Sequence, residues 1–256
     1  MNKPWQDFAD EIARCNDAGR AVDFWWRDDD AASAHAAFAR LSTLAAQTRV
    51  PLGLAVIPHR AQAELFGSLG AETAVLQHGF DHRNRAPQDE RPSEFPANEA
   101  AEVALERVVE GAERLAALAG AHLLPVLVPP WNRFSQALLA QLARRGIRGY
   151  SAFGPRVRAE PAPGVRQVNT HVDIIAWKRG RTFVGAERAL SAAVAHLEKR
   201  RTAAVDATEA TGWLTHHERH DEAAWRFLAE LFEFSRRQVG VRWLHPRELF
   251  AGGHGG

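Results

Sequence analysis

A regular alternation of short apolar runs with longer amphipathic segments is the feature that most constrains how this chain folds. The short runs are typical of buried strands, and the longer segments carry apolar residues at helical spacing. This rhythm predicts an α/β fold with a parallel sheet and helices outside it. Strands are expected at 21–27, 52–57, 73–77, 124–128, 147–151, 165–173, 212–216 and 241–244, and helices at 5–17, 33–48, 61–68, 98–120 (capped by Asn98), 135–145, 186–200 and 222–238.

Composition limits the number of domains and the class of partner. The 256 residues contain 46% hydrophobic and 25% charged residues, which is typical of a globular protein. We expect a single domain over 1–256, with an N-terminal helix within 1–20 and a flexible tail at 251–256. Because 32 Lys and Arg balance 31 Asp and Glu, a polar or neutral small partner is favoured over nucleic acid or a membrane. The sequence leaves open whether the protein forms an oligomer.

The sequence also bears on the cellular compartment. Its one cysteine, Cys15, lies on a predicted helix and is expected to be a buried structural thiol. The first residues, MNKPWQDFADEIARC, contain no apolar targeting segment, and no apolar run reaches the roughly 18 residues that a membrane span needs. These features predict a cytoplasmic protein.

Polar residues follow several of the predicted strands directly. They include Asp28 to Asp30, His78, the pair Pro129-Pro130, and His216. Barrel enzymes assemble their active sites at the carboxyl ends of the strands, from several loops. This distribution favours a closed or distorted barrel over an open doubly wound sheet.

Two groups of residues are candidates for holding a metal. Adjacent carboxylates at Asp28 to Asp30 repel one another, which fits a metal ligand beside a general base; a solvated turn that caps the next helix explains them equally well. His78 and His82 lie four positions apart, so both imidazoles can point the same way. Two imidazoles and one carboxylate leave an open position for water, and such a set accepts zinc, cobalt, nickel or iron.

Two further motifs carry possible catalytic groups. The prolines before Trp131 fix the backbone, so the Trp131 amide can bind an oxyanion, although the motif taken alone favours a rigid turn with a core tryptophan. His216 follows a strand and suits a general acid or base. His217 and His220 are interpreted instead as part of a helix start that Asp221 caps.

These motifs occur in one order along residues 21–217: Asp29-Asp30, His78 with His82, Pro129-Pro130-Trp131, Asp173 with Trp177, and Leu214 with His216. The succession resembles the polysaccharide deacetylase family, also called the NodB-homology family or carbohydrate esterase family four. The resemblance implies a distorted (β/α)7 barrel, a divalent metal, usually zinc, and hydrolysis of an N-acetyl amide by a water that the metal polarises. It implies Asp29 as base, Asp30, His78 and His82 as metal ligands, the Trp131 amide as oxyanion donor, His216 as general acid, and Pro130, Trp177 and Leu214 as substrate contacts.

The chain departs from the family pattern at three places. Three Asp precede Ala31, so the working pair is Asp29-Asp30, which we prefer, or Asp28-Asp29. Val128 stands where the family has an Arg that orients the base, and Arg27 or Arg133 is a candidate substitute. Ala176 stands where the family has the Asp that supports the catalytic His, and the candidate replacements are Asp173, Asp206 and Glu209.

The expected function is therefore metal-dependent removal of an acetyl group from an N-acetylated sugar or a related amide. The alternative is a non-catalytic or altered deacetylase-like barrel that acts as a binding protein, which Val128 and Ala176 favour. A glycosyltransferase ranks last because it leaves the two His unexplained. The polar segment 79–96 is too long for a plain connector, and we expect it to border the pocket or to pack against a neighbouring subunit.

Overall fold

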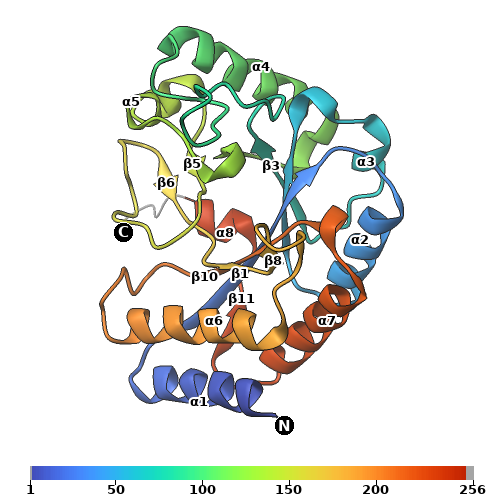
Figure 1. Ribbon diagram of the computed structural model, residues 1–256, viewed down its shortest axis with the longest axis vertical. Helices are drawn as coiled ribbons and strands as arrows, with labels where there is room; N and C mark the ends of the chain where they lie inside the picture. Colours follow the sequence, from blue (N-terminus) through green and yellow to red (C-terminus); the bar gives the residue numbers. More distant parts are fainter. Residues whose placement is uncertain (1, 252–256) are drawn as a thin grey trace.

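A curled sheet of parallel strands forms the centre of the computed structural model, which describes residues 2–251 (Figure 1). The strands follow one another in the order β6-β5-β4-β3-β2-β1-β10-β7, and β11 pairs with the start of β1. The sheet is a half-barrel, which confirms the predicted distorted barrel of a single domain. Its strands are β1 (Val22–Ala31), β2 (Leu52–Val56), β3 (Thr73–His78), β4 (Leu123–Val128), β5 (Gly149–Tyr150), β6 (Arg166–Gln167), β7 (Val172–Asp173), β10 (Thr211–Thr215) and β11 (Val241–Trp243).

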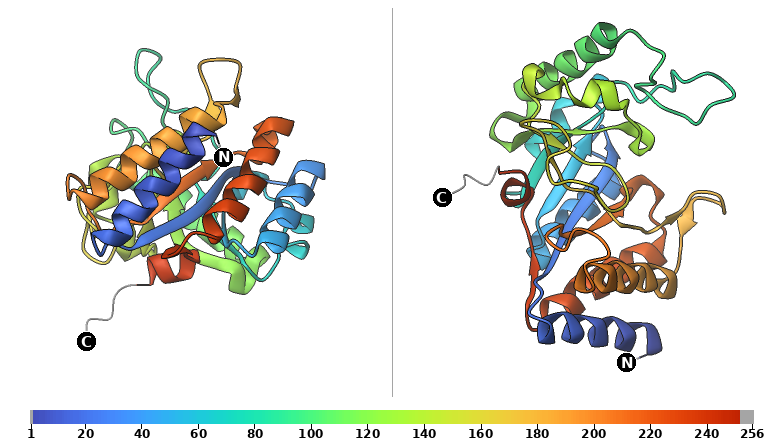
Figure 2. Two further views of the ribbon diagram at one scale, coloured as in Figure 1. Left: turned by 90° about the horizontal axis from the view of Figure 1, so that it is seen from below. Right: turned by 90° about the vertical axis from the view of Figure 1, so that its left-hand side faces the viewer.

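Most of the helices cover the outside of this sheet, whereas Leu249 and Phe250 of the C-terminal helix pack against Trp25 on its inner side. Figures 1 and 2 show α1 lying alongside α6, with α7 and α2 next to them. Their apolar faces and the outer face of the sheet form the largest core, in which the rings of Phe8 and Phe24 lie 5.9 Å apart and those of Trp26 and Phe232 4.7 Å apart. The helices are α1 (Lys3–Asp17), α2 (Ala36–Thr48), α3 (Ala63–Gly67), α4 (Ala101–Ala119), α5 (Gln136–Leu139), α6 (Ala186–Arg201), α7 (Glu222–Arg236) and α8 (Pro246–Phe250).

Strand β1 separates the outer core from the inside of the half-barrel. Side chains alternate between the two faces of a strand, and Phe24 and Trp26 accordingly pack in the outer core while Trp25 packs in the inner one. By the same alternation, the side chains of Arg27 and Asp29 lie on the inner face with Trp25. The strand runs beyond its predicted end at 27 because Asp28 still pairs with β2, so the acidic residues belong to the strand itself.

The predicted strand 165–173 is wrong as a single element. The chain forms β6, which pairs with β5, and then β7, which pairs with β10 at the opposite edge of the sheet. Between them the buried Asn169 accepts a hydrogen bond from the Ala152 N–H at 2.9 Å and donates one to the Gly154 carbonyl at 2.7 Å. These side-chain bonds replace ladder bonds where the chain crosses between the two edges.

Two helix predictions also need correction. The helix expected at 135–145 is divided into α5 and a 3-10 helix at Leu142–Arg145. Asn98 does not cap α4, which starts at Ala101 after Ala100 without a side-chain cap, because Pro96 begins a turn in which the Glu99 N–H donates to the Pro96 carbonyl. No helix among the described residues is long and apolar enough to cross a membrane.

Sequence patterns did not predict the antiparallel hairpin of β8 (Ile175–Ala176) and β9 (Thr182–Phe183). Figure 2 shows this hairpin and segment 79–96 projecting from the same side of the molecule. The predicted N-terminal helix is α1, and Cys15 on it is buried. Of the predicted tail 251–256, all but Ala251 lies outside the described residues.

Candidate active site

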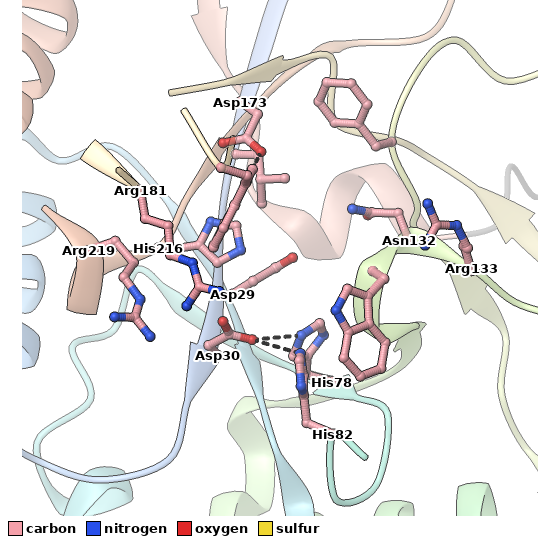
Figure 3. Close-up of a pocket in the computed structure, with 14 residues that line it drawn as sticks. Asp29, Asp30, His78, His82, Asn132, Arg133, Asp173, Arg181, His216 and Arg219 are labelled. Carbon is pink, nitrogen blue, oxygen red and sulfur yellow. Dashed lines mark hydrogen bonds and ion pairs between the residues drawn. The ribbon is translucent and has the colours of Figure 1, made fainter. Parts of the chain in front are cut away.

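A cavity of about 540 Å³ opens at the carboxyl ends of the strands. Because these ends meet at one edge of a parallel sheet, residues that are distant in the sequence converge there. Asp29 and Asp30 come from β1, His78 from the end of β3, and His216 from the end of β10 (Figure 3).

Asp30, His78 and His82 form a compact group with the chemistry of a metal site. The Oδ1 atom of Asp30 lies 3.1 Å from His78 Nε2 and 3.2 Å from His82 Nε2. His78 Nδ1 lies 3.0 Å from the Val128 carbonyl, which only accepts, so this nitrogen carries the proton. In the neutral ring Nε2 then presents a lone pair to a carboxylate oxygen. A ring proton or a metal ion relieves the contact between these two acceptors, and two imidazoles with one carboxylate form a donor set that fits a divalent metal.

Local backbone conformation brings Asp30 beside Asp29. In a regular strand Asp30 would lie on the same face as Asp28 and opposite Asp29. The pairing of β1 with β2 shifts register between Asp28 and Ala31, and Asp30 adopts a φ of 71°, in the left-handed region that Asp tolerates better than most residues. Asp29 and Asp30 are therefore the neighbouring carboxylates that line the pocket.

Asp28 points away from the pocket and forms a buried pair with His217. Its Oδ1 accepts from His217 Nδ1 at 2.5 Å, and its Oδ2 accepts from Thr215 Oγ1 at 2.6 Å. Burial raises the pKa of the Asp28 carboxyl, but the charge and hydrogen bond of His217 outweigh burial and hold this pKa below its usual range. Burial lowers the pKa of His217, and Asp28 outweighs it in turn and raises this pKa.

The sequence interpretation missed this role of His217. Asp221 does cap α7, as predicted, with its Oδ1 accepting from the Ala224 N–H at 2.8 Å. His217 lies in the preceding 3-10 helix (His217–Arg219) and supports β1 instead. His220 is held inside the fold, where burial lowers its pKa to about 4.

Arg27 fixes the carboxylate of Asp29. Its Nε and one terminal nitrogen donate to the two oxygens of Asp29 at 2.8 and 2.9 Å. Its other bonds go to Asn132 Oδ1 at 2.9 Å, Ser151 Oγ at 2.7 Å and the Ala152 carbonyl at 3.2 Å. All five N–H donors of the guanidinium are thus satisfied inside the protein. The pair is buried, with Arg27 fully covered and Asp29 3% exposed.

The structure distinguishes the two candidate substitutes for the missing family arginine. Arg27 contacts Asp29, whereas the guanidinium of Arg133 donates to the Pro92 carbonyl at 2.9 Å. Val128 is a buried apolar residue of the inner core. Arg27, two positions before the candidate base, therefore makes the contact that the resemblance implies for an arginine at position 128.

The turn after β4 carries two non-glycine residues with left-handed backbone. Trp131 and Asn132 have φ values of 55° and 56°, which is uncommon outside glycine. The Trp131 ring lies 4.5 Å from the His82 ring and lines the pocket, as do Trp177 and Leu214. Pro130, predicted to contact substrate, is buried and lies below the pocket surface, where a Cβ on Gly79 would collide with it.

Within residues 2–251, His216 has no hydrogen bond to a carboxylate such as the resemblance implies at position 176. Its Nδ1 is buried without a hydrogen-bond partner among the described residues, and the Trp177 ring packs edge-on against it at 4.6 Å. Asp173 shares the pocket but accepts its 2.7 Å bond from Trp177 Nε1, and burial raises its pKa. Asp206 pairs with Arg156 and Glu209 accepts from the Asn169 N–H, so neither candidate reaches His216.

Segment 79–96 supports the pocket more than it borders it. His82 is its only residue among those that line the cavity. The buried Glu94 accepts hydrogen bonds from the Phe80 and Asp81 N–H groups, each at 3.0 Å, and so holds the loop that carries His82. Gly79 allows this approach, since its φ is 58° and a Cβ there would lie 2.1 Å from Glu94 Oε2.

A second buried group of metal-type side chains, His171, His196 and Glu209, differs from the first in its hydrogen bonding. The Gly212 N–H donates to His171 Nδ1 at 2.9 Å, so the ring proton of a neutral His171 is on Nε2. That nitrogen lies 3.3 Å from Glu209 Oε2, a hydrogen-bond acceptor. The proton on Nε2 disfavours metal ligation there, and the group is a buried polar network.

Comparison with solved structures identifies the fold of the chain. No family model matches the sequence, and no curated protein matches it. A putative polysaccharide deacetylase from Mycobacterium smegmatis is similar with a TM-score of 0.61 and 15% identity, over 84% of this chain and 76% of that one. A family 4 acetyl xylan esterase from Clostridium thermocellum, in complex with a cobalt ion, is similar with a TM-score of 0.53 and 14% identity, over 90% of each chain.

A peptidoglycan deacetylase from Bacillus subtilis is similar with a TM-score of 0.55 and 14% identity, over 91% of each chain. These likenesses extend over most of the chain. At such low identity they establish the architecture rather than the activity. The protein has the NodB-like fold of the polysaccharide deacetylases and family 4 carbohydrate esterases.

Proposed function

We propose that the protein is a metal-dependent hydrolase that removes an acetyl group from an N-acetylated sugar or a related amide. The observation that carries the proposal is one cavity in which Asp30, His78 and His82 stand beside an Asp29 fixed by Arg27. His216 lines the same cavity. The deacetylases and esterases that share the fold support this assignment.

Asp30, His78 and His82 would hold the metal, with zinc as the first candidate and cobalt, nickel or iron as alternatives. A divalent ion bound there supplies positive charge that polarises water and the acyl carbonyl. The Val128 carbonyl keeps the His78 proton on Nδ1 and so leaves Nε2 free to ligate.

The remaining steps fall to side chains that the structure brings into the pocket. Asp29 takes the proton of the attacking water, and Arg27 holds its carboxylate in place with two hydrogen bonds. The Trp131 amide stabilises negative charge on the acyl oxygen. His216 gives a proton to the departing nitrogen, because an amine anion is too poor a leaving group.

The walls of the cavity suit a sugar bearing an acetyl group. Trp131 and Trp177 offer flat apolar faces, and Leu214 adds an aliphatic contact near His216. Trp25 and Trp213 are fully buried and belong to the cores. We therefore assign substrate contacts to Trp131, Trp177 and Leu214.

One observation favours a binding protein as the second candidate. The Nδ1 atom of His216 has no hydrogen-bond partner among the described residues, and Ala176 stands where the resemblance implies a supporting carboxylate. The second sequence feature that favours a binding protein is Val128, which stands in place of an arginine that orients the base. Arg27 contacts Asp29 directly, so Val128 is no longer an argument against turnover.

The deciding experiment combines metal analysis with product release. Purified protein is stripped with chelator and reloaded with zinc or cobalt, and acetate release is followed on a panel of N-acetylated sugars. We expect about one metal per chain and acetate release that returns on reloading. Asp29→Asn is the matched control, because it removes the base while leaving the three ligands. Metal binding without acetate release from any substrate favours the binding protein.

A further inference from the structure

Three arginines line the pocket: Arg133, Arg181 and Arg219. The carboxylates of the same pocket contact other groups and not these arginines. Asp29 accepts from Arg27, Asp30 lies against His78 and His82 in the candidate metal site, and Asp173 accepts from the Ile175 N–H and Trp177 Nε1. Within residues 2–251 the guanidinium groups of Arg181 and Arg219 have neither a hydrogen bond nor an ion pair, so the pocket contains two positive charges that its own acids do not neutralise.

Both of these arginines belong to segments that surround His216. Arg219 ends the 3-10 helix after β10, and its N–H donates to the His216 carbonyl at 2.8 Å. Arg181 lies in the turn of the β8–β9 hairpin, with a φ of 56°, and its N–H donates to the Ala176 carbonyl at 3.2 Å. Ala176 precedes Trp177, whose ring packs on His216.

Figure 3 shows Arg181 and Arg219 on one side of Asp30, near His216, and Asn132 with Arg133 on the other side. His216 is the group assigned to protonate the departing amine. The two unpaired guanidinium groups therefore face the part of the substrate that leaves as the amine, rather than the acetyl group.

We propose that the amine-bearing part of the substrate carries an oxyanion, a phosphate or a carboxylate, which binds between Arg181 and Arg219. The inference rests on the proposed deacetylase function and narrows its substrate to acidic N-acetylated sugars. A guanidinium presents a planar fork of donors that matches both kinds of oxyanion, and two forks from separate segments fix the position of the anion as well as its charge. Neutral N-acetylated sugars lack this contact.

The test compares three substrates that differ only in charge-bearing groups: N-acetylglucosamine, its 6-phosphate, and N-acetylmuramic acid, which has a carboxylate. In the zinc-loaded protein we expect kcat/KM to be at least about tenfold higher for an acidic substrate than for the neutral one. The acidic substrate with the higher kcat/KM shows whether the two arginines prefer a phosphate or a carboxylate. The double variant Arg181→Gln/Arg219→Gln should lose this preference through a raised KM, with kcat nearly unchanged.

Arg179→Gln is the matched control, because Arg179 is an exposed residue of the same hairpin that does not line the pocket. It should keep the preference. Equal kcat/KM for neutral and acidic sugars, or a preference that survives in the double variant, overturns the inference and leaves the deacetylase function intact.

A binding measurement separates the two proposals. Calorimetry with glucosamine 6-phosphate and glucosamine, on metal-free and zinc-loaded protein, needs no turnover. Binding of the phosphate that the double variant loses, with no acetate released from any of the three substrates, supports the anion site and removes the deacetylase function. Absence of both arginine-dependent binding and turnover overturns the anion site as well.

Discussion

The guanidinium of Arg27 makes two hydrogen bonds to the carboxylate of Asp29, two positions further along the same strand. Strand periodicity places the two side chains on one face, so the contact is local. The same guanidinium also bonds Asn132, in the turn that carries Trp131. One residue thus connects the candidate base with the candidate oxyanion donor.

Replacing Arg27 tests this connection. Arg27→Lys keeps the charge but cannot supply five donors in a planar fork, and we expect kcat to fall by about 100-fold or more while metal content is retained. Arg27→Met leaves the buried Asp29 without a partner, which should cost about 3–5 kcal/mol of stability. Acetate release, metal analysis and urea unfolding measure these effects. Arg133→Gln serves as control, and an equal loss there argues against a special role for Arg27.

Three substitutions distinguish the aspartates of β1. Asp30→Asn should lower bound metal well below one per chain, as should His78→Ala and His82→Ala, because two ligands hold the ion poorly. Asp29→Asn should keep the metal and lose acetate release. Asp28→Asn should keep both metal and chemistry but lower the melting temperature, since it breaks the pair with His217. Loss of metal in Asp29→Asn but not in Asp30→Asn contradicts this assignment.

The Nδ1 atom of His216, which has no hydrogen-bond partner among residues 2–251, predicts a specific gain of function. A carboxylate beside an imidazole favours its charged form, so it raises the imidazole pKa. Ala176→Asp should therefore move the alkaline limb of the kcat/KM profile to higher pH and raise the rate near neutrality. His216→Ala should abolish that limb. An unchanged profile in Ala176→Asp together with retained activity in His216→Ala rejects His216 as the acid.

Glu94 offers a test of the segment that carries His82. Glu94→Ala removes the acceptor for the Phe80 and Asp81 N–H groups, and we expect metal affinity to fall about 10–100-fold through loss of ligand positioning. Glu90→Ala, at an exposed position of the same segment, is the matched control and should leave metal affinity unchanged. Metal titration of both variants measures the effect. Because no residue after His82 in this segment lines the pocket, trimming residues 86–91 should leave turnover unchanged.

Acid stability should depend on His196. Burial and then the charges of His171 and Arg200 lower the pKa of His196 to about 2. Below pH 6.5 the unfolded chain therefore takes up a proton that the folded chain excludes, and stability falls as pH falls. The loss amounts to roughly 2 kcal/mol at pH 5. Urea unfolding between pH 7 and 5 should show a flatter dependence in His196→Gln than in the wild type, whereas the exposed His59→Gln should match the wild type.

Sequence periodicity by itself determined the architecture. Alternation of apolar runs with amphipathic segments requires helices outside a parallel sheet, and this prediction is confirmed. It also determined that Asp29, Asp30, His78 and His216 lie near one another, since all four follow or end parallel strands whose carboxyl ends share an edge. Their chemical roles stay predictions.

Only the tertiary structure decided which neighbouring side chains pair. The bulge at Asp30 reverses the expected alternation along β1, so Asp29 and Asp30 share the pocket while Asp28 bonds His217, 189 positions away. The crossing between β6 and β7 and the hairpin that carries Arg181 are likewise absent from any local pattern. Periodicity reports which face a residue takes in regular structure, whereas bulges, left-handed backbone and buried ion pairs depend on partners that only folding brings into contact.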